Sequence, residues 1–265
     1  MKSVRKALTI AGSDSGAGAG IQADLKTFAA LGVYGTSAIT AVTAQNTVGV
    51  SQVFALNPNL VGAQIDAIMD DIGAHALKTG MLANAGIIET VVNKIRQHRL
   101  KNLVVDPVMV ATSGDLLIKR NAVAALRSQL IPLAAVVTPN IPEAEELTGM
   151  RLRGDQDIAA AARLIVAMGA KAVVIKGGHL KGPAIDLFFD GKKFIALKAP
   201  RVRTKNTHGT GCTFSAAIAA YLAQGKNLES AVRAAKKYIT AAIRAGFTVG
   251  AGHGPVHHFH DFWKV

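Results

Sequence analysis

Short apolar runs alternate with longer amphipathic segments along most of the chain. The runs are rich in small and β-branched residues and are bounded by glycine, proline or polar residues, which is typical of buried strands. They predict strands at residues 7–11, 37–43, 76–79, 103–105, 134–137, 171–175, 186–189 and 194–197. Apolar positions at helical spacing predict helices over residues 21–31, 57–72, 84–99, 115–130, 157–169, 214–223 and 228–244.

This alternation of strands and helices determines the expected fold class. It predicts an α/β protein with a mostly parallel central sheet and helices on both faces, in three α/β/α layers. Asp190-Gly191 between the last two strands is a hairpin signal, and it marks the one clear antiparallel element. Nothing in the chain resembles a linker, so we expect residues 1–265 to form a single domain.

Composition narrows the class of protein further. Hydrophobic residues make up 50% of the chain and charged residues 18%, which supports a large core and argues against disorder. The single cysteine excludes an intramolecular disulfide framework and fits a reducing compartment. No apolar run is long enough to span a membrane, and the run after the basic N-terminus is too short for a signal peptide. We therefore expect a cytoplasmic protein with no membrane partner.

The formal net charge of +13 raises the question of nucleic-acid binding. The lysines and arginines are scattered, and aromatic residues make up only 5% of the chain, so no stacking platform is evident. A solvated basic surface explains the charge better than a nucleic-acid partner. Such a surface also attracts phosphorylated small molecules.

Polar or glycine residues follow nearly every predicted strand at its carboxyl end. In open α/β sheets this edge binds ligands. The residues are Gly12, Gln45, Gly80, Asp106, Asn140, Lys176 and Gly209. Together they offer carboxylates for Mg²⁺, a lysine for phosphate and a candidate base, which are the groups that phosphoryl transfer requires. The chain carries no Walker or protein-kinase motif.

Residues 205–214 form the stretch with the clearest chemical signal. Gly209 and Gly211 stand where a loop becomes a helix, and they allow close backbone approach to a ligand. The unpaired amides and the dipole of such a helix start bind anions. Cys212 lies in this positive field, so we expect its thiol to ionise more easily than a free one. A glycine-containing helix start that binds nothing remains the alternative.

Several other candidate residues have structural explanations that need no ligand. The glycine-rich loop at residues 12–20 fits a tight turn, and Asp24 fits the first turn of the following helix. Asn140 and Glu143 have the spacing of a capping box. The tail histidines match no standard zinc spacing and are interpreted as incidental; they are His253, His257, His258 and His260.

Seven motifs, taken together and in order, cover nearly the whole chain. They lie at residues 7–16, 40–47, 78–82, 105–109, 138–140, 176–179 and 208–213. With them the chain closely resembles the hydroxymethylpyrimidine/phosphomethylpyrimidine kinases of thiamine biosynthesis, which belong to the ribokinase-like superfamily. Ala17 departs from the pattern, because the family's loop usually carries glycine there.

The resemblance implies a ribokinase-like fold and a reaction. The γ-phosphate of ATP would pass to the hydroxymethyl group of 4-amino-5-hydroxymethyl-2-methylpyrimidine, and a second transfer onto the monophosphate would give the diphosphate. ATP and Mg²⁺ would be the cofactors, and a homodimer is common in the family. The nearest alternative is a kinase for pyridoxal, since some pyridoxal kinases share these motifs.

The resemblance also implies roles for individual residues. Cys212 would be the catalytic base, and the amides of Gly209, Thr210 and Gly211 would form an anion hole. Gln45 would hydrogen-bond to the pyrimidine edge, where the amine favours a pyrimidine over a pyridine aldehyde. The rest of the pyrimidine pocket would be Gly12, Asp24, Met81 and Val108. Binding of ATP phosphates would fall to Lys176, Asp106, Thr207 and His208, with Asn140 and Glu143 organising Mg²⁺.

Overall fold

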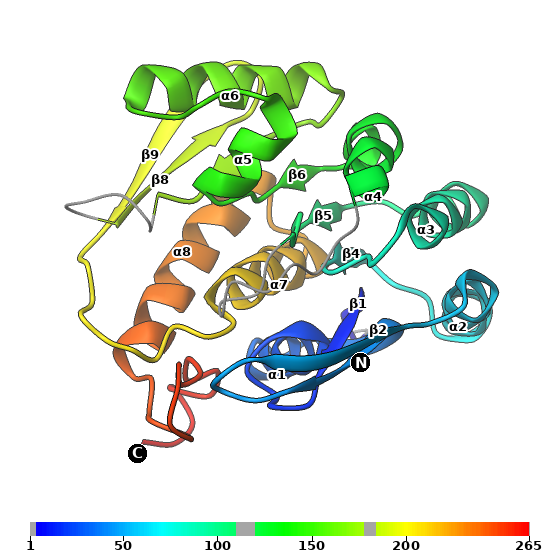
Figure 1. Ribbon diagram of the computed structural model, residues 1–265, viewed down its shortest axis with the longest axis horizontal. Coiled ribbons are helices and arrows are strands. Elements are labelled where there is room, and N and C mark those ends of the chain that lie inside the picture. The colour runs from blue at the N-terminus through cyan, green and yellow to red at the C-terminus, as the bar shows by residue number, and fades with distance from the viewer. Residues whose placement is uncertain (1–3, 110–119, 178–183, 265) are drawn as a thin grey trace.

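The computed structural model describes residues 4–109, 120–177 and 184–264. Within these residues one sheet of nine strands runs in the order β3-β2-β1-β4-β5-β6-β7-β8-β9 (Figure 1). The strands are β1 (Lys6–Asp14), β2 (Tyr34–Gln45), β3 (Val50–Ala55), β4 (Ala76–Thr79), β5 (Leu103–Val105), β6 (Val136–Val137), β7 (Val173–Ile175), β8 (Ala184–Phe189) and β9 (Phe194–Ala199). The strands from β2 to β7 in this order pair in parallel, and β3, β8 and β9 add antiparallel pairs at the two edges.

Helices cover both faces of the sheet, so the expected α/β class with a mostly parallel central sheet is confirmed. The helices are α1 (Gly20–Ala30), α2 (Pro58–Asp71), α3 (Ala85–Gln97), α4 (Arg120–Ala125), α5 (Ile141–Thr148), α6 (Asp155–Ala167), α7 (Thr210–Ala223) and α8 (Leu228–Arg244). A π-helical turn at Leu126–Leu130 and a 3₁₀ turn at Ile131–Leu133 follow α4.

The two helical layers enclose two separate apolar cores. One core packs side chains of α2 to α6 against one face of the sheet, and the other packs α1, α7 and α8 against the opposite face. Successive residues of a strand point into opposite cores. Leu103 and Val105 face the first core, and Val104 faces the second. Burial on both faces explains why these strands are continuous apolar runs.

Helix α7 lies in the second core and is buried along nearly its whole length. Its alanine-rich sequence allows close packing against α1 and α8, which flank it (Figure 1). The helix begins at Thr210, four residues before the predicted start at residue 214. Gly211 and Cys212 therefore lie inside its first turn.

Several other predictions of the elements need correction. Strand β1 continues through residues 12–14, which were expected in the glycine-rich loop. Strand β3 was not predicted, because each of its residues is at least partly exposed and so it lacks a buried apolar pattern. The hairpin at Asp190-Gly191 is confirmed, but β2–β3 and β7–β8 are antiparallel as well. Of the helix predicted at 115–130, residues 115–119 lie outside the described part of the chain.

A helix must be both long and apolar to cross a membrane, and the described residues contain no such helix.

Candidate active site

The start of α7 is held by its own loop and by the glycine-rich loop that follows β1. Gly209 has a left-handed backbone with φ 76°, and the hydroxyl of Thr210 donates to the carbonyl of Thr207 at 2.7 Å. A Cβ at Gly209 would lie 1.8 Å from the carbonyl oxygen of Gly18. Only glycine fits this position, because both its φ and its contact exclude a side chain. The two loops are therefore packed backbone to backbone.

Asp14 at the end of β1 organises the glycine-rich loop. Its carboxylate accepts hydrogen bonds from the amides of Gly16 at 2.8 Å, Gly18 at 3.1 Å and Ala19 at 2.8 Å. Burial alone would raise the pKa of Asp14, but the hydrogen bonds from His208 and Ala19 lower it overall. The carboxylate is therefore the form that holds the loop. This role of Asp14 was not predicted, although an aspartate before a glycine run is a turn signal.

His208 contacts both the glycine-rich loop and Gln45, the residue expected to bind the substrate. Its Nε2 lies 2.8 Å from Oδ2 of Asp14 and 3.5 Å from Nε2 of Gln45. Its ring fills the space in which a Cβ of Gly18 would stand. The ring thus contacts Asp14 and Gln45, and the expected role of His208 in binding ATP phosphates stays a prediction.

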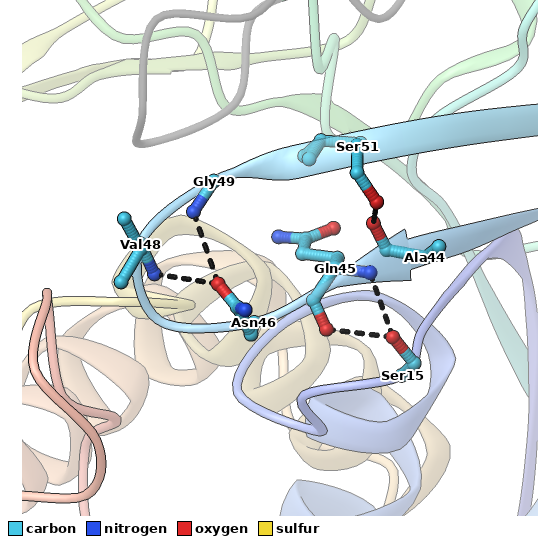
Figure 2. A pocket seen from close by; sticks show the side chains of 8 residues that line it. Ser15, Ala44, Gln45, Asn46, Val48, Gly49 and Ser51 are labelled. Carbon is cyan, nitrogen blue, oxygen red and sulfur yellow. Dashed lines mark hydrogen bonds between the residues drawn. The ribbon is translucent and has the colours of Figure 1, made fainter.

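Gln45 stands at the end of β2 beside an open pocket of about 640 Å³. Figure 2 shows its side chain between the two strands of the β2–β3 hairpin, while its main chain is held by Ser15. The hydroxyl of Ser15 donates to the carbonyl of Gln45 at 2.6 Å, and the amide of Gln45 bonds the same hydroxyl at 2.7 Å. The glycine-rich loop and the hairpin thus position Gln45 together.

A second group of charged residues lies on the other side of the α7 start. Nζ of Lys176 lies 3.1 Å from Oδ1 of Asp106 and 4.0 Å from Oε2 of Glu143. A Cβ on Gly211 would lie 3.1 Å from the same Nζ, so the ammonium is directly beside the first turn of α7. Burial alone would lower the pKa of Lys176, but Asp106 and Glu143 raise it overall. This lysine therefore carries its charge at the helix start.

Asn140 and Glu143 form the capping box that their spacing predicts. The side chain of Asn140 accepts from the amide of Glu143 at 2.8 Å, and Oε2 of Glu143 accepts from the amide of Asn140 at 2.8 Å. Burial raises the pKa of Glu143 to about 7, although Lys176 opposes the shift. The capping role is thus established for both residues, and the side chain of Asn140 is already engaged.

The fit of this region to Mg²⁺ depends mainly on Asp106. Its Oδ2 is buried and has no hydrogen-bond partner among the described residues. A buried carboxylate oxygen that lacks a partner suits a hard divalent cation. No group of three or more histidine, cysteine or acidic side chains in the described residues is arranged to hold a metal by itself. Asp106 and Glu143 therefore fit a cation that shares its coordination with phosphate oxygens.

The pKa expected for Cys212 is wrong in direction. Burial raises the pKa of this thiol to about 11, and the carboxylates of Asp106 and Asp24 add to the rise, whereas Lys78 opposes it. Desolvation raises the pKa by more than the positive end of the helix lowers it. Removing a thiolate from water costs more free energy than its interaction with the helix dipole contributes. The thiol is therefore protonated in the free protein at neutral pH.

Lys78 and Asp24 form a buried ion pair beneath the site, which sequence analysis missed. Nζ of Lys78 lies 2.9 Å from Oδ2 of Asp24, and both side chains are fully buried. The hydroxyl of Thr9 donates to the same oxygen at 2.6 Å. The sequence did carry a signal for this ion pair: Lys78 lies inside a four-residue strand that is otherwise suited to the core.

This pair changes the interpretation of Asp24. The residue lies in the second turn of α1, not in the first, so its partner is Lys78 rather than the helix dipole. The carboxylate is fully buried and its Oδ1 has no hydrogen-bond partner among the described residues, and the place of Asp24 in the pyrimidine pocket stays a prediction.

The remaining expected residues lie around the same region. Sδ of Met81 lies 3.1 Å from the position of a Cβ on Gly12, so these two residues are in contact across β1 and β4. Val108 follows β5 and its amide donates to the carbonyl of Asp106 at 2.8 Å. Residues 178 and 179 of the motif after β7 lie outside the described part of the chain.

Comparisons with known proteins identify the family. The phosphomethylpyrimidine kinase family model matches residues 14–257. The chain belongs to the phosphomethylpyrimidine kinase family. It is 56% identical over 262 residues to a hydroxymethylpyrimidine/phosphomethylpyrimidine kinase of Rhizobium meliloti, covering 97% of this chain and 98% of the relative. The kinase class expected from the motifs is confirmed.

Solved structures of the family and of pyridoxal kinases have the same fold. A phosphomethylpyrimidine kinase from Clostridium difficile matches with a TM-score of 0.82 and 46% identity, covering 91% of this chain and 100% of that one. An ADP complex of Bacillus subtilis pyridoxal kinase matches with a TM-score of 0.90 and 46% identity, covering 97% of this chain and 98% of that one. The ribokinase-like fold is confirmed, and both substrate classes occur among close relatives.

Proposed function

We propose that this kinase transfers the γ-phosphoryl group of ATP to the hydroxymethyl group of 4-amino-5-hydroxymethyl-2-methylpyrimidine, and then to the resulting monophosphate. The observation that carries the proposal is the glycine-rich start of α7, with Lys176 and Asp106 on one side and Gln45 on the other. Full-length similarity to a kinase named for both phosphorylations supports the substrate. The single cysteine fits the cytoplasm as its compartment.

The amides of Gly209, Thr210 and Gly211 are proposed to bind the moving phosphoryl group. They belong to the start of a helix, where backbone N–H groups lack intrahelical partners; the amide of Thr210 donates to the loop carbonyl of Thr207 at 3.2 Å. Fixed donors stabilise the charge that develops on the phosphoryl oxygens, without reorganising during the reaction. Lys176 beside Gly211 adds a positive charge at the same place.

Asp106 and Glu143 are proposed to hold Mg²⁺ together with the ATP phosphates. The unpartnered Oδ2 of Asp106 supports this assignment, and Asn140 contributes by fixing the capping turn that carries Glu143. Bound Mg²⁺ supplies neutralisation of phosphate charge.

Cys212 is proposed to take the proton of the substrate hydroxyl. The thiol is protonated in the free protein, so this role requires a thiolate in the loaded site. Lys78 favours the thiolate and Asp106 opposes it, and neutralising Asp106 therefore lowers the pKa of Cys212.

A groove of about 420 Å³ between β9 and α8 is proposed for the nucleoside of ATP. It is lined by basic side chains that include Lys198, Lys237 and Arg244. Asp186 connects the groove to the phosphate side, because its carboxylate bonds both the amide of Gly177 at 3.0 Å and Nζ of Lys236 at 2.7 Å.

A homodimer through the β2–β3 hairpin is also proposed. Val42 and Phe54 are directly opposite on neighbouring strands, and they are 46% and 71% exposed. Paired apolar side chains of this size on an edge hairpin favour burial against a second copy. Phe54→Ser should convert a dimer to a monomer in light scattering; a chain that is monomeric without the substitution contradicts this assembly.

Product analysis tests the proposed reaction. With Mg·ATP and the hydroxymethylpyrimidine, phosphorus NMR should show a monophosphate ester first and a diphosphate later. Gln45→Leu should reduce kcat/KM for the pyrimidine by about tenfold or more, because the pyrimidine edge then lacks its partner. A monophosphate that never progresses would reject the second transfer.

A further inference from the structure

Residues 252–258 run along the candidate site, although the histidines of this tail were expected to be incidental. The amide of Gly252 donates to the hydroxyl of Thr47 at 3.2 Å, and the amide of His253 donates to the Thr47 carbonyl at 2.9 Å. Thr47 lies two residues after Gln45. The amide of His208 then donates to the carbonyl of Gly254 at 3.0 Å, directly before the start of α7. One short segment thus bonds both the Gln45 loop and the anion-hole loop.

Glycines allow the close approach of this segment to its neighbours. A Cβ on Gly252 would lie 1.9 Å from the carbonyl oxygen of Thr47, and one on Gly254 would lie 2.2 Å from Oδ1 of Asn206. Both distances are shorter than real Cβ contacts, so a side chain at position 252 would displace the backbone of Thr47, and one at position 254 would displace the side chain of Asn206 and the carbonyl of Phe247. The segment is therefore fitted between two loops on which the site depends.

His258 continues these contacts into the first turn of α7. Its Nε2 lies 3.0 Å from the hydroxyl of Thr213, the residue after Cys212. Tyr238 on α8 donates to the carbonyl of His258 at 2.6 Å, which fixes its backbone. Burial lowers the pKa of His258 to about 3, and the nearby Lys26 and His257 add to this effect. The ring is consequently neutral at physiological pH, and its bond to Thr213 does not switch with pH in that range.

We propose that residues 252–258 are a positioning element of the active site. His258 acts through Thr213 to fix the first turn of α7, while Gly254 and the Thr47 contacts fix the preceding loop in register with Gln45. This inference rests on the proposed anion-hole role of residues 209–211. None of these side chains is assigned contact with substrate, so they are positioning residues.

The consequence is a defined kinetic effect of the bond between His258 and Thr213. Misplacing the anion-hole amides by a fraction of an ångström weakens transition-state binding more than ATP binding, since ATP is held by several other groups. His258→Ala and Thr213→Val should each lower kcat by about 10- to 100-fold. The KM for ATP should change less than about threefold.

A double-mutant cycle separates positioning from general destabilisation. The two substitutions remove the same bond, so the double variant should lose no more activity than either single variant. His258→Gln keeps a hydrogen-bonding group near Thr213 and should recover much of the lost kcat. Thr148→Val is the matched control, because it removes a hydroxyl bond of 2.7 Å to the Ala144 carbonyl at the end of α5, outside both α7 and the tail. That control should lower the melting temperature and leave kcat unchanged.

The decisive readings are kcat and melting temperature for the same samples, assayed well below unfolding. Thr213→Val is nearly isosteric, so it reports on the bond even if His258→Ala does not fold. Unchanged kcat in Thr213→Val overturns the positioning role, and so do losses that add in the double variant. Failure of the proposed anion hole has a different signature: Lys176→Met, which removes the positive charge beside Gly211, would then retain full kcat, whatever the tail variants show.

Discussion

The ionisation of Cys212 is the electrostatic property that matters most for the proposed mechanism. Its pKa of about 11 lies well above the value of roughly 8.5 for an ordinary thiol. At pH 8 the thiolate fraction is therefore about one in 1,000, against roughly one in four for a free cysteine. Because the chain has a single cysteine, any thiol signal of the protein belongs to this residue.

Two assays measure this pKa directly. Thiolate absorbance near 240 nm is recorded against pH, with Cys212→Ser as the blank for the tyrosines. The rate of alkylation by iodoacetamide, which follows the thiolate fraction, is measured on the same samples. The rate should rise about tenfold per pH unit from pH 7 to pH 10 without levelling off.

A substitution tests the cause as well as the value. Asp106 raises the pKa of Cys212, so Asp106→Asn should move the titration to lower pH. Glu146→Gln, at an exposed position of α5, is the control and should leave it in place. A wild-type titration that levels off below pH 8.5 would refute the claim that burial dominates, and would restore the original expectation of a thiol activated by the helix start.

Three further outcomes are expected. Ala17 has φ 60°, so Ala17→Gly should relieve strain of about 1 kcal/mol; urea unfolding checks this, and a clear loss of stability would contradict it. Burial favours the protonated form of Glu143 in the folded state, so the free energy of unfolding should fall as pH rises from 4.5 to about 7. Glu143→Gln should abolish this pH dependence of stability, and an unchanged dependence would be inconsistent with the raised pKa of Glu143. Lys78→Met should destabilise the protein by about 3 kcal/mol or more, because the buried carboxylate of Asp24 then loses its cationic partner and, among the described residues, keeps only the hydrogen bond from Thr9. The Lys78→Met/Asp24→Asn double variant should recover part of the loss, and additive losses in chemical denaturation would oppose this.

The fold was predictable because its parallel strands are buried on both faces. Such strands appear as continuous apolar runs whether or not their neighbours are known. Strand β3 escaped prediction because it is exposed and lies at the edge of the sheet, next to β2. The start of α7 was placed too late, because the glycines that favour a loop are accommodated by contacts from the distant loop after β1.

The site was predictable where position along a strand determines chemistry. Asp106 follows β5 and Lys176 follows β7, two parallel strands on either side of β6, and the structure brings the two side chains into contact. The ionisation of Cys212 and the burial of Asp24 were not predictable, since both depend on side chains brought together by tertiary packing. The role of His258 was hidden for the same reason: its partner Thr213 lies 45 positions away.

A competition experiment tests the central claim most directly. Hydroxymethylpyrimidine and pyridoxal are supplied together with limiting Mg·ATP, and the two phosphorylated products are separated and counted. At equal concentrations of the two substrates and low conversion, the product ratio equals the ratio of kcat/KM for the two substrates. The proposed role of Gln45 predicts a large excess of pyrimidine phosphates in the wild type and a smaller excess in Gln45→Leu. Pyridoxal phosphate as the main wild-type product would contradict the assigned substrate while leaving the kinase fold intact.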